Sequence, residues 1–115
     1  MGKRHRKSFS TLEAVLGIPD LVRIWQGDEA MTARKIAFPP GSIFYVDPNA
    51  DFSTGDYVGA YIAAENRYVV RRYHGKRANG ALETALRPLN RRIPAIILVE
   101  GDRIIGRALG AMVKL

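Results

Sequence analysis

Short segments in which apolar and polar residues alternate, separated by turn-forming residues, are the feature that most constrains the fold of this chain. The clearest are Leu21–Gln26 and Ser42–Val46, and the second lies between proline-containing turns at residues 39–41 and 47–48. A period of two places successive side chains on opposite faces of a strand, and the turns end each strand. The sequence therefore predicts a mainly β, antiparallel fold.

The middle of the chain continues this pattern. Tyr57–Ala63 and Arg67–Tyr73 are predicted to form a hairpin across residues 64–66, with a polar loop at residues 74–80. Ala81–Leu89 remains open between helix and strand, because its composition favours a helix.

Two further strands are expected near the C-terminus. Ala95–Glu100 is a continuous apolar run, which is typical of a strand buried on both faces. Arg103–Val113 is predicted to be the last strand, and Gly106 and Gly110 indicate bends or bulges within it.

One short helix is expected ahead of the strands. Ser10 and Glu13 fit a capping box, and the helix would run to Leu16 before Gly17 and Pro19 end it. Residues 1–9 are polar and basic, as in a mobile arm. The chain of 115 residues is thus divided into a basic arm and linker helix at 1–19 and one compact domain at 20–115.

Basic residues gather in two stretches and give the chain a net charge of +7. The first stretch contains Lys3, Arg4, Arg6 and Lys7. The second contains Arg67, Arg71, Arg72, Lys76, Arg77, Arg87, Arg91 and Arg92. Such clusters attract phosphate backbones or an acidic partner, although a solvated basic face has the same composition.

Several classes of protein are disfavoured by the composition. The chain has no cysteine, which excludes disulfides and thiol catalysis and fits the cytoplasm of a cell. It lacks an apolar run of about 18 residues, so no membrane span is expected. His5 and His74 lack the spacing of metal ligands, and Asp47, Asp51 and Asp56 lie near turns that they can cap themselves. Neither a metal nor a cofactor is expected.

A series of motifs runs through most of the chain in a fixed order. They are GDEAM at residues 27–31, FPPG at 38–41, VDP at 46–48, GD at 55–56, RR at 71–72, LRPLN at 86–90 and IIGRA at 104–108. Taken together, these motifs resemble the C-terminal domain of the LexA-like self-cleaving repressors, especially those of lambdoid phages. The resemblance covers roughly residues 20–115.

The resemblance implies a β-rich fold that dimerises. In active members of the family, a serine just before the methionine attacks a peptide bond of the repressor's own chain. A lysine on the hairpin strand is the base, because burial disfavours its charged form. Bacterial members are triggered by RecA filaments, and the domain is paired with an N-terminal helix-turn-helix that binds DNA.

This chain departs from the family at both catalytic positions. Ala30 stands at the serine position and has no nucleophile, and Arg71 stands at the lysine position. Arginine is effectively never deprotonated in proteins and therefore cannot act as the base. The sequence therefore predicts a pseudo-peptidase: a non-cleaving phage or prophage repressor domain that dimerises or oligomerises and is controlled by an antirepressor protein.

Two surfaces are the candidates for contacts. The oligomer interface is assigned to Ile104, Ile105, Ala108, Leu109, Met112 and Val113. Contacts with a protein partner or nucleic acid are assigned to Lys3, Arg4, Arg6, Lys7, Arg71, Arg72, Lys76 and Arg77, and the last four are expected to form an accessible basic face. DNA is otherwise expected to be bound by a helix-turn-helix domain preceding these residues.

Two alternatives remain open. One is an active self-cleaving peptidase of the same family, in which an alanine at position 30 replaces the serine. The other is a stand-alone basic module that binds nucleic acid through the two clusters of basic residues.

Overall fold

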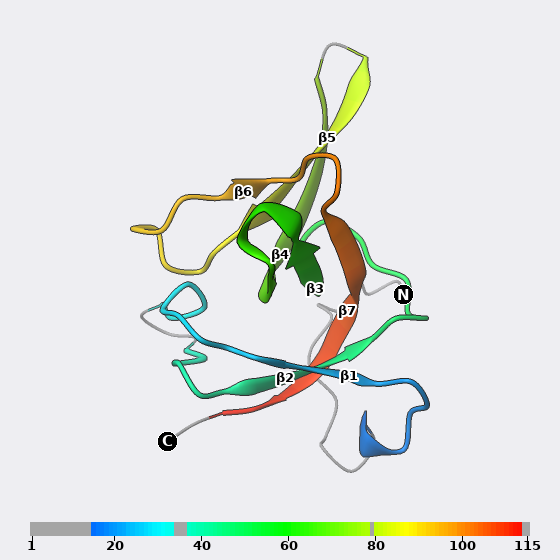
Figure 1. Cartoon of the computed structure of the whole chain (residues 1–115), viewed down its shortest axis with the longest axis vertical. Helices are drawn as coiled ribbons and strands as arrows, with labels where there is room; N and C mark the ends of the chain where they lie inside the picture. Colours follow the sequence, from blue (N-terminus) through cyan, green and yellow to red (C-terminus); the bar gives the residue numbers. More distant parts are fainter. Residues whose placement is uncertain (1–14, 34–36, 79, 114–115) are drawn as a thin grey trace, which may run out of the picture.

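In the computed structural model, which describes residues 15–33, 37–78 and 80–113, seven strands form one antiparallel sheet (Figure 1). The strands are β1 (Val22–Trp25), β2 (Ile43–Asp47), β3 (Tyr57–Ile62), β4 (Arg67–Ala78), β5 (Ala81–Arg87), β6 (Ile96–Ile97) and β7 (Arg103–Met112). Their order in the sheet is β1-β2-β7-β3-β4-β5-β6, and the sheet curls so that β1 also contacts β4. The predicted mainly β fold is confirmed.

The last strand lies in the interior of the sheet, between β2 and β3. Its pairing shifts register twice, once between Tyr45 and Val46 of β2 and once between Gly59 and Ala60 of β3. On β7 these shifts fall beside Gly110 and Gly106, where bends were predicted. A bulge adds one unpaired residue and increases the local twist, which helps the long strand β7 to pair with both β2 and β3.

Two apolar clusters form the core. The first contains Ile24, Met31, Phe38, Phe44, Val46, Val70 and Ala108. The second contains Val58, Ala60, Ile62, Val69 and Leu86. Strand alternation lets β4 supply both clusters with neighbouring residues, since Val70 belongs to the first and Val69 to the second.

The β3–β4 hairpin is confirmed, and the region after it differs from the prediction. Residues 74–80 were expected to form a loop, but β4 continues to Ala78 and pairs residue by residue with β5. The sequence left Ala81–Leu89 open between helix and strand, and this pairing shows that the segment from Ala81 is a strand. Helical propensity is a weak preference, and here the hydrogen bonds to β4 override it.

The prediction for Ala95–Glu100 was wrong. Only Ile96–Ile97 is a strand, β6, which pairs with β5 alone at the end of the sheet. The side chains of Ile97 and Val99 are largely exposed. A strand at the edge of a sheet has a neighbour on one side only, and a run of apolar residues does not reveal that position.

The predicted N-terminal helix lies mostly outside the described residues, as does the basic arm. Val15 is fully buried, Leu16 is about half exposed, and the Ile18 N–H donates to the Val15 carbonyl in a turn. Within the described ranges, no helix is long and apolar enough to cross a membrane.

Candidate functional site

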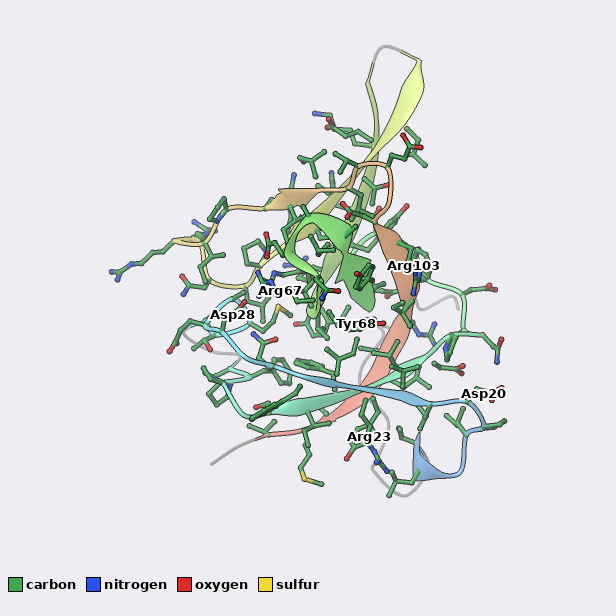
Figure 2. The ribbon with its side chains drawn as sticks, viewed as in Figure 1. Asp20, Arg23, Asp28, Arg67, Tyr68 and Arg103 are labelled. Carbon is green, nitrogen blue, oxygen red and sulfur yellow. The ribbon has the colours of Figure 1, made fainter. Side chains whose placement is uncertain are left out.

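A single carboxylate, that of Asp28, joins the loop after β1 to strand β4. Its Oδ1 accepts hydrogen bonds from the Ala30 N–H at 2.9 Å and from Gln26 Nε2 at 2.8 Å. Its Oδ2 accepts from Arg67 Nη1 at 3.0 Å and from Arg71 Nη2 at 3.2 Å. Figure 2 labels Asp28 and Arg67, which lie side by side. The carboxylate therefore receives hydrogen bonds from both Ala30 and Arg71, the two positions that the sequence analysis singled out.

Arg71 is buried on β4, with only 2% of its side chain exposed. Its Nη1 donates to the Val70 carbonyl at 2.9 Å, and its Nε has no hydrogen-bond partner among the described residues. Burial lowers the pKa of Arg71, and the attraction of Asp28 opposes that effect without cancelling it. The guanidinium still carries its charge at neutral pH, so it cannot accept a proton from a nucleophile.

The two partners of Arg71 in this cluster have shifted pKa values as well. Burial acts to raise the pKa of Asp28, but hydrogen bonds from Ala30, Arg67 and Arg71 outweigh it and hold the pKa below its usual value. Burial acts to lower the pKa of Arg67, but Glu65 and Asp28 raise it overall. All three groups are therefore charged near neutral pH, as two cations and one half-buried carboxylate.

Ala30 is itself fully buried and fixed by its backbone. Its carbonyl accepts hydrogen bonds from the N–H groups of Leu89 at 2.8 Å and Asn90 at 2.9 Å. The Asn90 side chain adds a bond to the Glu29 carbonyl at 3.3 Å. The loop is thus held from two sides, by β4 through Asp28 and by the segment after β5.

The motifs that carry the family resemblance contact one another in this fold. The 27–31 motif meets Arg71 through Asp28 and meets the 86–90 motif through Ala30. The 46–48 motif lies against Gly106, whose added Cβ would stand 2.2 Å from the Asp47 carbonyl oxygen. The Phe38 N–H donates to the Met31 carbonyl at 2.8 Å. Their order along the chain therefore reflects contacts that build the domain.

Sequence reasoning identified Ala30 and Arg71 but missed three members of the cluster, Asp28, Gln26 and Arg67. Arg67 stood out only as part of a basic stretch. Its spacing of four residues from Arg71 was the usable signal, because residues four apart on a strand share a face. Nothing in the sequence around Gln26 distinguished it from an ordinary polar residue at the end of a strand.

The expected accessible basic face is wrong for Arg71, since that side chain is buried. Arg72 and Lys76 are exposed. His74, expected in a loop, is half-buried within β4. The side chain of Arg77 and the four basic residues of the N-terminal arm lie outside the described part of the chain.

The interface candidates on β7 divide between core and surface. Ala108 is buried, and Ile104 and Ile105 pack against the two core clusters. Leu109 is half-buried. Met112 and Val113 are 48% and 40% exposed.

Met112 ends a row of apolar residues that crosses three strands. It pairs with Ile43 of β2, which pairs in turn with Trp25 of β1. Trp25 is 72% exposed, the most exposed large apolar side chain among the described residues. Directly opposed residues on neighbouring strands point to the same face, so these three side chains form one patch.

Two of the three aspartates near turns, Asp47 and Asp56, accept hydrogen bonds from nearby backbone N–H groups. Asp47 Oδ1 accepts from the Asn49 N–H, and Asp56 Oδ2 accepts from the Ser53 N–H, each at 2.9 Å. In the part of the chain that the structure describes, no three His, Asp or Glu side chains are grouped so that they could hold a metal ion.

No protein-family model matches this sequence, and no curated protein matches it. Functional inference therefore rests on the Asp28 cluster and on the exposed surfaces.

Proposed function

We propose that this chain is a non-cleaving domain of the LexA-like repressor type, which self-associates and thereby supports DNA binding. The observation that carries the proposal is the shared partner of Ala30 and Arg71. The Ala30 N–H and Arg71 Nη2 both donate to the Asp28 carboxylate, at 2.9 and 3.2 Å. Two positions chosen on family motifs alone thus meet in space, which supports a common architecture.

The chemistry of that cluster suits a structural role. Alanine offers no nucleophile and a charged arginine no base, so proton abstraction followed by acyl transfer has no starting point. The ion pair instead joins the 27–31 loop to β4. A domain that keeps the fold in this way retains its surfaces for assembly.

Self-association is supported by the patch of Trp25, Ile43 and Met112, in which Trp25 and Met112 are exposed and Ile43 is half-buried. Exposed aromatic side chains and methionine are enriched at protein interfaces, and Val113 follows directly on the chain. Pairing across a two-fold axis would bring two such patches together. Two linked DNA-binding units then gain affinity, because the second binding event becomes intramolecular.

The same proposal includes a partner protein. A repressor that cannot cleave itself needs another route of inactivation, and we assign that role to an antirepressor that disrupts assembly. Phage or prophage origin is part of this proposal.

Sedimentation equilibrium over a concentration series tests the self-association. We expect a dimer by about 100 μM, where an association free energy of only about 5–6 kcal/mol becomes visible. The double substitution W25S/M112S should shift the protein to monomer. The matched control is Leu82→Ser, which removes another exposed apolar side chain, on β5, and should leave the dimer intact.

A monomer at that concentration, or equal effects of W25S/M112S and L82S, would contradict the proposed assembly. The lack of self-cleavage has its own check. After Ala30→Ser, incubation with RecA filaments at alkaline pH should leave the intact mass unchanged. Cleavage of that variant would support the alternative of an active peptidase and remove the inhibitory role assigned to Arg71.

A further inference from the structure

The outer part of the β4–β5 hairpin projects from the body of the protein as a two-stranded ribbon (Figure 1). We call residues 72–78 and 81–87 the basic ribbon. Its base belongs to the wider sheet, because Arg72 also pairs with Tyr57 of β3, and Ala85 and Leu86 pair with β6; only its outer part is two-stranded. Its strands pair continuously from Arg72 opposite Arg87 to Ala78 opposite Ala81. At about 3.4 Å per residue, the ribbon is roughly 20 Å long.

The ribbon carries an excess of positive charge. It contains Arg72, Lys76, Arg77 and Arg87, and Glu83 is its one acidic residue. Arg72 and Arg87 are exposed and directly opposite each other, and neither forms an ion pair within the described residues. Like charges at directly opposed positions destabilise a strand pair. An anion bound between the two guanidinium groups would remove that repulsion.

The surface of the ribbon fits nucleic acid better than protein. Protein interfaces are centred on buried aromatic or aliphatic side chains. Leu82 is the one large apolar side chain that the described part of the ribbon exposes. The outer, two-stranded part of the ribbon has the width that the major groove of a DNA duplex admits, about 12 Å. Phosphate groups then line both sides of the ribbon.

We propose that the basic ribbon binds the phosphate backbone of duplex DNA, with the opposed arginines at its base, Arg72 and Arg87, as the main contacts. Phosphate contacts carry no sequence information, so the binding is independent of sequence and strongly dependent on salt. The proposal does not rest on self-association, since a monomer carries the complete ribbon. It would give the domain a DNA contact of its own, separate from any helix-turn-helix.

Fluorescence anisotropy with a labelled duplex of about 20 base pairs, measured over a salt series, tests this proposal. The test variant is R72Q/R87Q. Its control is R23Q/R103Q, which removes the same charge from two exposed arginines on the body of the protein (Figure 2). We expect the test variant to bind about 10-fold or more weakly at low salt. The slope of log K against log salt should fall by about 2, one for each lost phosphate contact, while the control keeps the wild-type slope.

Three results would overturn the proposal. They are unchanged binding by R72Q/R87Q, equal weakening in both variants, and displacement of the DNA by poly-L-glutamate as effectively, per charge, as by unlabelled duplex. The last result would assign the ribbon to acidic polypeptides.

The melting temperature of R72Q/R87Q should equal or exceed that of the wild type, because the substitution removes repulsion. If this variant fails to fold, R72K/R87K replaces it. That variant keeps both charges and should bind within about 3-fold of the wild type, because phosphate accepts either cation as a point charge. Loss of binding by folded R72K/R87K would contradict a contact based on charge.

Discussion

Arg71 and Arg72 are chemically identical neighbours with opposite environments. The pleat of β4 turns Arg71 into the interior, where Asp28 balances its charge, and turns Arg72 outward to solvent. A charged side chain inside a protein is tolerated only with a partner and hydrogen bonds. The same residue type therefore serves the structure at one position and is available for binding at the next.

The two ends of the Asp28–Arg71 pair should respond differently to substitution. Asp28→Asn leaves a buried guanidinium without a counter-charge and should cost about 1–3 kcal/mol of unfolding free energy at pH 7. Arg71→Met should cost less, because Asp28 keeps Arg67 and partial contact with water. Urea denaturation of both variants measures the difference. A larger loss in Arg71→Met would contradict this asymmetry.

The contribution of Asp28 should also depend on pH. Its pKa is lower in the folded protein than in the unfolded chain, so its stabilising effect is complete above the unfolded value of about 3.9. That effect is lost as the pH falls through the lower, folded value. The stability difference between wild type and Asp28→Asn should therefore be constant from pH 5 to 7 and shrink in more acidic buffer.

Sequence reasoning reached the ends of this cluster but not its centre. Ala30 and Arg71 stood out because each breaks a motif, whereas Asp28 matches its motif and carries no such signal. The burial of Arg71 was not predicted, because a basic stretch is typical of a surface and the pleat was not assigned to its residues. Knowledge of the Val69 and Val70 partners across the sheet was needed to place it.

At the scale of elements, β7 shows where glycine is required by its surroundings. A Cβ on Gly106 would lie 2.2 Å from the carbonyl oxygen of Asp47 and 2.7 Å from Pro48 Cα, and both are backbone atoms that cannot turn aside. The bulge beside Gly106 and the close approach of the turn after β2 thus depend on each other.

Gly106→Ala should therefore destabilise the fold by about 2–4 kcal/mol, measured by thermal or urea denaturation. Gly27→Ala is the matched control, because its added Cβ would meet nothing within 4 Å. That control should change stability by no more than about 0.5 kcal/mol. Comparable losses of stability in the two variants would show that the close backbone contact is not the reason that Gly106→Ala is destabilising.

The elements differ in how far the sequence could define them. Bends at Gly106 and Gly110 were predictable, because glycine inside an alternating strand often marks a bulge or a close approach of another backbone. The extension of β4 to Ala78 and the strand character of β5 were not, since each depends on the other as a pairing partner. The edge position of β6 was not predictable either, because the apolar run that contains it is equally typical of a buried strand.

At the scale of the whole molecule, the sheet depends on its last strand and not on its ribbon. Removal of β7 would break the strand pairing between β1 and β2 on one side and β3, β4, β5 and β6 on the other, since β7 is hydrogen-bonded to both β2 and β3. The outer part of the β4–β5 hairpin projects from the body of the protein in Figure 1.

A chain ending at residue 102 should therefore lack cooperative unfolding, as followed by circular dichroism during heating. In the matched variant, residues 77–82 are replaced by Asn-Gly, which shortens the ribbon by four residues and closes it with a two-residue turn. This variant should unfold cooperatively within a few degrees of the wild type. A folded chain without β7, or an unfolded one with the short ribbon, would contradict this division.

The interior place of β7 also sets the order of events during synthesis. Translation releases β2 and β3 well before residue 112 leaves the ribosome, and both then expose unpaired edges. Exposed strand edges are templates for pairing with other chains. The nascent protein consequently passes through an interval in which most of its sequence is available and its sheet cannot close, and that interval is when chaperones would matter most to its yield.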